Sequence, residues 1–162
     1  SLPDIFLNNI DPERFSTLLL TAINHSKNKD KDFRVWDYLE NKERYVTAKK
    51  IISGLQEKRF ENFRLPIGKV ICNGYEIPEL TIGIYFPVDE TEFIYRQLEF
   101  DYRQGNDWTD DSIKALFEYI SILKDLCPTI EVFRAKEGWR DHPDEIFTRA
   151  FNLYYSNTRD SA

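Results

Sequence analysis

Residues 67–103 read IGKVICNGYEIPELTIGIYFPVDETEFIYRQLEFDYR and contain the strongest strand signals in the chain. The first apolar run, 67–72, is rich in β-branched residues and ends at Asn73-Gly74, a pair that readily adopts the two positive φ angles of a type I′ turn. After a return arm over 75–77, a second run places alternate apolar side chains on one face: Leu80, Ile82, Ile84 and Phe86. These patterns predict a β-hairpin followed by a further strand, with one face of the sheet buried.

The segment that precedes this stretch carries two helical patterns. Residues 1–10 are expected to form an extended lead-in, and the Asp-Pro-Glu run at 11–13 predicts the start of a helix that ends before the charged loop 28–32. Residues 33–39 fit no single pattern, whereas 41–59 is typical of a second helix. The expected core positions of the two helices are Phe15, Leu18, Leu19, Ala22 and Ile23, then Tyr45, Ala48, Ile52 and Leu55.

The segment after the sheet predicts a helix, a strand and a second helix. The clearest helix runs from Thr109 to a Cys-Pro stop at 127–128, a short strand covers 130–135, and a loop follows over 136–142. The last helix is expected to start within 141–145, and the polar tail from residue 156 is expected to fray. The expected core positions are Ile113, Leu116, Phe117, Ile120 and Leu123, then Ile146, Phe147, Ala150, Phe151 and Tyr154.

Between these parts, residues 92–103 alternate apolar and charged side chains and predict a half-buried strand. The apolar parity holds Ile94, Leu98, Phe100 and Tyr102, and the opposite parity holds Glu99, Asp101 and Arg103. Pro66 is expected to separate the helical N-terminal part from the sheet.

The order of elements predicts an α+β fold in one domain that spans residues 1–162. We expect an antiparallel sheet of about four to five strands, packed against two N-terminal and two C-terminal helices. The parts are a two-helix segment over 11–60, the sheet over 67–103, and a helix–strand–helix segment over 109–156.

The composition argues against several classes of function. The chain has 162 residues with 22 basic and 28 acidic side chains, and a net charge of −6 disfavours binding to nucleic acid or to anionic membranes. No apolar run approaches the length of about 18 residues that a membrane span needs, and no signal sequence is recognisable. Cys72 and Cys127 lack the spacing of a zinc site and are expected to be buried free thiols, so we expect a protein of the reducing cytoplasm. The sequence predicts no cofactor and no metal.

The search for catalytic motifs leaves one weak alternative. The chain contains no GxGxxG, GxxxxGK[ST], GxSxG or HExxH motif. Glu99 and Asp101 stand two residues apart, so both carboxylates leave one face of the predicted strand at a separation of about 7 Å. With His142, which is flanked by acidic residues, they would suit a metal-dependent hydrolase or nuclease. The competing interpretation is a solvated strand face and a capping histidine.

The leading hypothesis rests on an acidic, aromatic-bearing surface. Residues 89–111 contain eight acidic and two basic side chains, and 2 − 8 = −6 equals the net charge of the whole chain. Trp108 and Trp139 lie in turn segments, where exposed aromatic rings often anchor protein interfaces. Small acidic α+β proteins with such a surface and no catalytic motif resemble bacterial immunity proteins, which block toxins. The resemblance implies a non-catalytic inhibitor of a cationic protein partner, and the expected contacts are Glu99, Asp101, Asp107, Trp108, Asp110 and Trp139.

Overall fold

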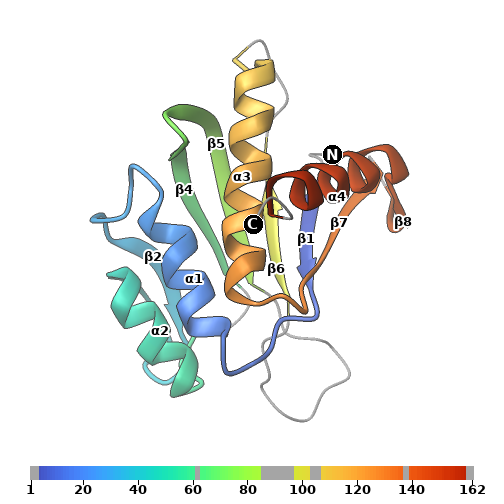
Figure 1. Ribbon diagram of the computed structural model, residues 1–162. Helices are drawn as coiled ribbons and strands as arrows, with labels where there is room; N and C mark the ends of the chain where they lie inside the picture. Colours follow the sequence, from blue (N-terminus) through green and yellow to red (C-terminus); the bar gives the residue numbers. More distant parts are fainter. Residues whose placement is uncertain (1–3, 61–62, 85–96, 103–106, 137–138, 160–162) are drawn as a thin grey trace.

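The computed structural model describes residues 4–60, 63–84, 97–102, 107–136 and 139–159, and within these ranges the fold is α+β, as predicted (Figure 1). The elements in chain order are β1 (Asp4–Asn8), α1 (Phe15–Asn24), β2 (Phe33–Asp37), β3 (Lys42–Val46), α2 (Ala48–Gln56), β4 (Phe63–Cys72), β5 (Tyr75–Ile84), β6 (Leu98–Asp101), α3 (Asp110–Leu126), β7 (Glu131–Lys136), β8 (Trp139–Pro143) and α4 (Glu145–Arg159).

The main sheet is antiparallel, with the strand order β4-β5-β6-β1-β7-β8. The expected lead-in at the N-terminus is therefore wrong in part, because β1 lies in the middle of the sheet between β6 and β7. Ile5 and Leu7 of this strand are both fully buried. A five-residue strand is too short to show a clear period, and its partners are far away in the sequence.

The predicted hairpin is confirmed. Asn73 and Gly74 have φ angles of 53° and 78°, as a type I′ turn requires, and they join β4 to β5. β5 is one continuous strand over the two runs that the sequence suggested. Pro66 lies within β4, not before the sheet, because a strand at the edge of a sheet tolerates a residue without an N–H group.

The predicted second helix is wrong over about its first third, residues 41–47. Residues 42–46 form β3, which pairs with β2 in a separate two-stranded sheet, and this hairpin also resolves the ambiguous segment 33–39. The helix α2 starts only after Thr47, whose side chain accepts a hydrogen bond from the backbone N–H of Lys50. Tyr45 is consequently 69% exposed, although the helical pattern placed it in the core.

The helices α1, α3 and α4 lie on the same side of the main sheet, and α2 packs against α1 (Figure 1). Tyr119 of α3 joins these layers, because its ring packs against Phe100 of β6 at 5.6 Å and its hydroxyl donates a hydrogen bond to the carbonyl of Ala22 in α1. The predicted core face of α1 is confirmed, although the helix begins at Phe15 after a turn. In α3 the prediction holds except for Phe117, which is half-buried against the core, and Ile113, which is 44% exposed.

The C-terminal part departs from the prediction in three respects. The expected loop contains β8, which pairs with β7. In α4 only Phe151 of the expected core positions is buried, and Ile146 is 83% exposed. The helix continues into the expected frayed tail as far as Arg159, which forms ion pairs with Glu118 at 2.9 Å and Asp125 at 3.1 Å.

The described part of the chain also bears on the expectations about the two cysteines and about membrane-spanning helices. Cys72 and Cys127 are buried and free, as predicted. None of the helices in the described ranges combines the length and the apolar character that crossing a membrane would require.

Candidate functional site

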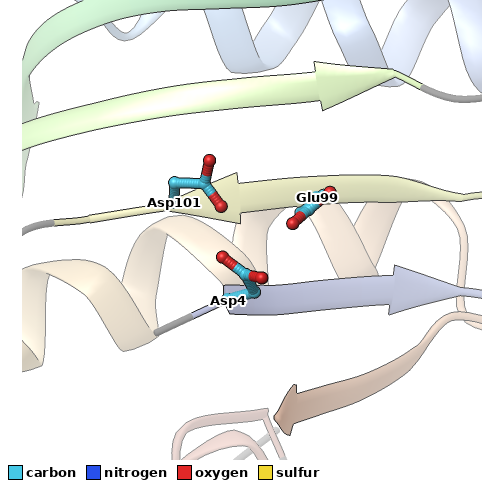
Figure 2. Close-up of side chains that lie close together, drawn as sticks. All are labelled: Asp4, Glu99 and Asp101. Atoms are coloured by element: carbon cyan, nitrogen blue, oxygen red, sulfur yellow. The ribbon is translucent and has the colours of Figure 1, made fainter. Parts of the chain in front are cut away.

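Three carboxylates meet on the face of the main sheet that is turned away from the helices (Figure 2). Asp4 of β1 lies directly opposite Asp101 of β6, and Glu99 has the same parity on β6. Residues of the other parity, such as Phe100, point towards α3. We call Asp4, Glu99 and Asp101 the carboxylate cluster.

The cluster is compact and largely buried. Each of its residues offers a carboxylate oxygen, and these oxygens all lie within 4.8 Å of one another. Glu99 is 1% exposed and Asp101 is 4% exposed, whereas Asp4 is half-buried. The solvated strand face expected for Glu99 and Asp101 is therefore wrong. The alternation along β6 correctly placed both acids on one face, but it could not show that this face is covered.

The electrostatics of the cluster limit what it can do. Arg64 of β4 forms an ion pair with Oδ2 of Asp101. Oδ1 of Asp101 is buried and accepts no hydrogen bond from any residue that the structure describes. Carboxylates this close repel one another when ionised, so the arrangement suits either a shared proton or a bound cation. An all-oxygen set of ligands is the kind that hard divalent cations prefer.

A second candidate site is a groove of about 450 Å³ between the start of β5 and the start of α3. Its lining includes Tyr75, Glu76 and Pro78 on one side and Asp107, Thr109 and Asp111 on the other, and we call it the acidic groove. Thr109 caps α3 by accepting a hydrogen bond from the backbone N–H of Ser112, and this start places two acids in the first turn of the helix.

Three side chains of the acidic groove are well placed for a partner. Asp107 and Asp111 are exposed, and Tyr75 is 46% exposed. Glu76 is already engaged, because Lys27 lies 2.8 Å away and Lys69 lies 3.7 Å away, and the hydrogen bond from Lys27 lowers the pKa of Glu76. Lys69 also lines the groove and offsets the charge of Glu76, so the negative charge of the lining comes from the two aspartates.

The remaining predicted contacts do not form one surface with these residues. Asp110 is exposed in the first turn of α3. Trp108 is half-buried, and its ring packs against Tyr102 at 5.0 Å, so it covers part of the core instead of projecting into solvent. The backbone of Trp139 and His142 belongs to β8, and their side chains lie outside the described structure. Residues 85–96, and with them the first acids of the 89–111 run, also lie outside it.

Sequence reasoning missed one exposed aromatic surface. Trp36, Tyr38, Leu39 and Tyr45 are 41–69% exposed on or beside the β2–β3 hairpin, and we call them the aromatic face. A groove of about 470 Å³ separates this hairpin from Arg64 and Pro66 of β4. Burial along β2 alternates with a period of two, but the sequence does not show it, because the exposed position 36 holds Trp and the buried position 37 holds Asp. The partner strand, residues 42–46, was predicted to be part of a helix.

Comparisons of the chain with protein-family models, with curated proteins and with solved structures found no match.

Proposed function

We propose that this protein is a non-catalytic, acidic protein-binding domain of the immunity or antitoxin type, which blocks a basic partner such as a bacterial toxin. The acidic groove carries the proposal, because it combines exposed Asp107 and Asp111 with the half-exposed ring of Tyr75 in one concave surface. Exposed aromatic rings and complementary charge are the features that anchor and orient partners at protein interfaces.

The chemistry of the groove suits a lysine or arginine side chain of the partner. Its cationic head would lie between Asp107 and Asp111, and its aliphatic stem would pack on Tyr75. Asp110, one residue from this pair, adds to the field that attracts a cationic protein. Glu99 and Asp101, which the sequence suggested as contacts of the partner, are not part of the proposed contact surface, because both are buried. Trp139 remains a contact predicted from the sequence alone.

The experiment compares capture of a partner from cells of the source organism by wild type and by a charge-reversed variant. Asp107→Lys/Asp111→Lys should lose a basic protein that the wild type retains, because the cationic side chain would then meet like charges. The matched control is Glu13→Lys/Glu131→Lys, which makes the same change in net charge at exposed positions outside the groove. This control separates local contacts from the overall field.

Kinetics with the purified partner complete the test. The association rate constant should fall as salt rises, since exposed charges are screened within about 8 Å at physiological ionic strength. Asp107→Lys/Asp111→Lys should slow association well beyond the control. Equal rates for the two double variants would refute the groove as the interface. Binding lost in Trp36→Ala but retained in the groove variant would place the interface on the aromatic face.

A second candidate function is a metal-dependent hydrolase or nuclease, and the specific observation that favours it is the carboxylate cluster. Paired acidic residues that hold Mg²⁺ or Mn²⁺ can activate water for attack on a phosphodiester. In this case the acids come from Asp4, Glu99 and Asp101, of which two are buried, and His142 would act as the base. Hydrolysis of a nucleic acid substrate that requires Mg²⁺ or Mn²⁺ and is lost in Asp101→Asn would support this candidate. Absence of such activity in the wild type would reject it.

A further inference from the structure

We propose that the carboxylate cluster binds one hard divalent cation, with Asp4, Glu99 and Asp101 each supplying a carboxylate oxygen. This inference is independent of the protein-binding function. It is a condition for the hydrolase alternative, but a cation can also be held at such a site without any catalysis.

The spacing of the oxygens sets the first condition. Two oxygens bound to one ion can be no further apart than twice the metal–oxygen distance, which gives about 4.6–5.2 Å for Ca²⁺ and about 4.2 Å for Mg²⁺. In the cluster, one oxygen from each residue lies within 4.8 Å of the other two. The separations are therefore within the upper limit for Ca²⁺, whereas Mg²⁺ needs the widest of them to be no more than about 4.2 Å.

The second observation is the state of Asp101. Its side chain is 5% exposed, Arg64 pairs with Oδ2, and the buried Oδ1 accepts no hydrogen bond from the described residues. A buried acceptor without a donor costs about 1–3 kcal/mol, and more when the group is charged. A cation placed between Oδ1 and the neighbouring carboxylates would satisfy this oxygen and would also offset the repulsion among the acids.

The sheet supplies the rigidity that a metal site needs. β1 and β6 are paired through four residues, and Asp4 lies opposite Asp101 in this register, so the backbone fixes the separation of two ligands before an ion arrives. Asp4, the first residue of β1, is half-buried, so it is the ligand of the cluster whose side chain remains partly in contact with solvent. Three protein ligands leave further coordination positions for water, as is usual for Ca²⁺ and Mg²⁺.

The test is isothermal titration calorimetry in a metal-depleted buffer with CaCl₂, MgCl₂ and MnCl₂ in turn, accompanied by thermal unfolding. We expect one ion per chain and an unfolding midpoint that rises with the concentration of the ion that binds, because binding to the native state stabilises it. Asp101→Asn and Asp4→Asn should each weaken the affinity by about tenfold or more. The matched control, Glu131→Gln, makes the same change in charge on the adjacent strand β7 and should bind as the wild type does.

Two results would overturn the inference: no binding and no thermal shift with any of the three ions, or an affinity that is unchanged in both Asp4→Asn and Asp101→Asn. If Asp101→Asn does not fold, Asp4→Asn decides, because Asp4 is half-buried at a strand end and its replacement leaves the pair of Arg64 and Asp101 in place. Cation binding without hydrolysis would reject the enzyme alternative alone.

Discussion

Replacing Gly54 with alanine tests the packing that holds the β2–β3 hairpin to the rest of the protein. Gly54 is buried in α2, and a Cβ atom there would lie far inside van der Waals contact with Cδ2 and Cε2 of Phe60, with Cζ at 3.0 Å. Phe60 is 2% exposed, and its backbone bridges to Asp37 at the end of β2. The ring would have to move by on the order of 1 Å to restore ordinary carbon–carbon contacts of about 3.5–4.0 Å.

Two opposing effects determine the magnitude. Overpacking of a core costs about 1–3 kcal/mol, and the size of the displacement places Gly54→Ala near the upper limit. Alanine in a helix interior is favoured over glycine by about 1 kcal/mol. We therefore expect a net loss of about 2 kcal/mol in the free energy of unfolding, which corresponds to a fall of about 4–8 °C in the unfolding midpoint of a chain of this size.

The assay is urea and thermal unfolding of the variant beside the wild type. Ser53→Ala is the control, because Ser53 is exposed in the same helix and its replacement should change the free energy by no more than about 0.5 kcal/mol. A Gly54→Ala protein that is as stable as the wild type, or more stable, would refute the argument that the Phe60 ring needs the space above this glycine.

Two further predictions concern the β4–β5 hairpin. Gly74→Val should destabilise the fold by about 1–3 kcal/mol in urea unfolding, because a β-branched residue resists the φ of 78° at this position. Steric overlap does not contribute, since a Cβ atom there would meet nothing within 4 Å. Gly74→Asn should retain most of the stability, because asparagine tolerates a positive φ. Burial raises the pKa of the Cys72 thiol to about 11, so thiol labelling of the native protein at pH 8 should be slow and should accelerate as the pH rises. Rapid labelling of Cys72 or of the buried Cys127 at pH 8 would contradict their burial.

The sequence predicted those elements whose patterns are long and uninterrupted. The turn at Asn73-Gly74 and the helix α3 were found because turn chemistry, capping and a sustained period agree at these places. The short strands β1, β3 and β8 were missed, because five residues carry too little periodicity to outweigh the patterns beside them. The division between β3 and α2 depends on Thr47 as a cap, a signal that was present but was overridden by the helical spacing around it.

The structural role of Gly54 could not be predicted from the sequence either. By helix propensity, a glycine at position 54 only weakens α2, whereas in the structure the ring of Phe60 occupies the space that a Cβ atom of residue 54 would need. Such a requirement depends on a contact made in three dimensions, and local propensity does not contain it. Similarly, α4 has an apolar pattern, but at its start Phe147 packs against Phe117, whereas the adjacent Ile146 is exposed.

The candidate sites could be predicted only in part, because a sequence shows which residues share a strand face but not which distant strands pair. Parity along β6 correctly placed Glu99 and Asp101 together, and the run around Asp107 and Asp111 correctly marked an exposed acidic segment at the start of α3. The third carboxylate, Asp4, could not be found, because its proximity to Asp101 depends on the pairing of β1 with β6 across most of the chain.

Because β6 is buried on both faces, two acids of the carboxylate cluster lie in the interior of the protein, where charged side chains are unusual. All four residues of this strand are buried, with Leu98 and Phe100 on the helix side and Glu99 and Asp101 on the other. Replacing buried ionic groups with apolar side chains of similar volume is often neutral or stabilises a protein by about 1–4 kcal/mol, so stability alone does not account for acids at the centre of a sheet. Residues that oppose stability in this way are concentrated at functional sites. The acidic groove and the carboxylate cluster therefore differ in what they can bind. The carboxylates of the groove are exposed to solvent and can attract a cationic protein, whereas those of the cluster are largely buried and are accessible only to a small cation.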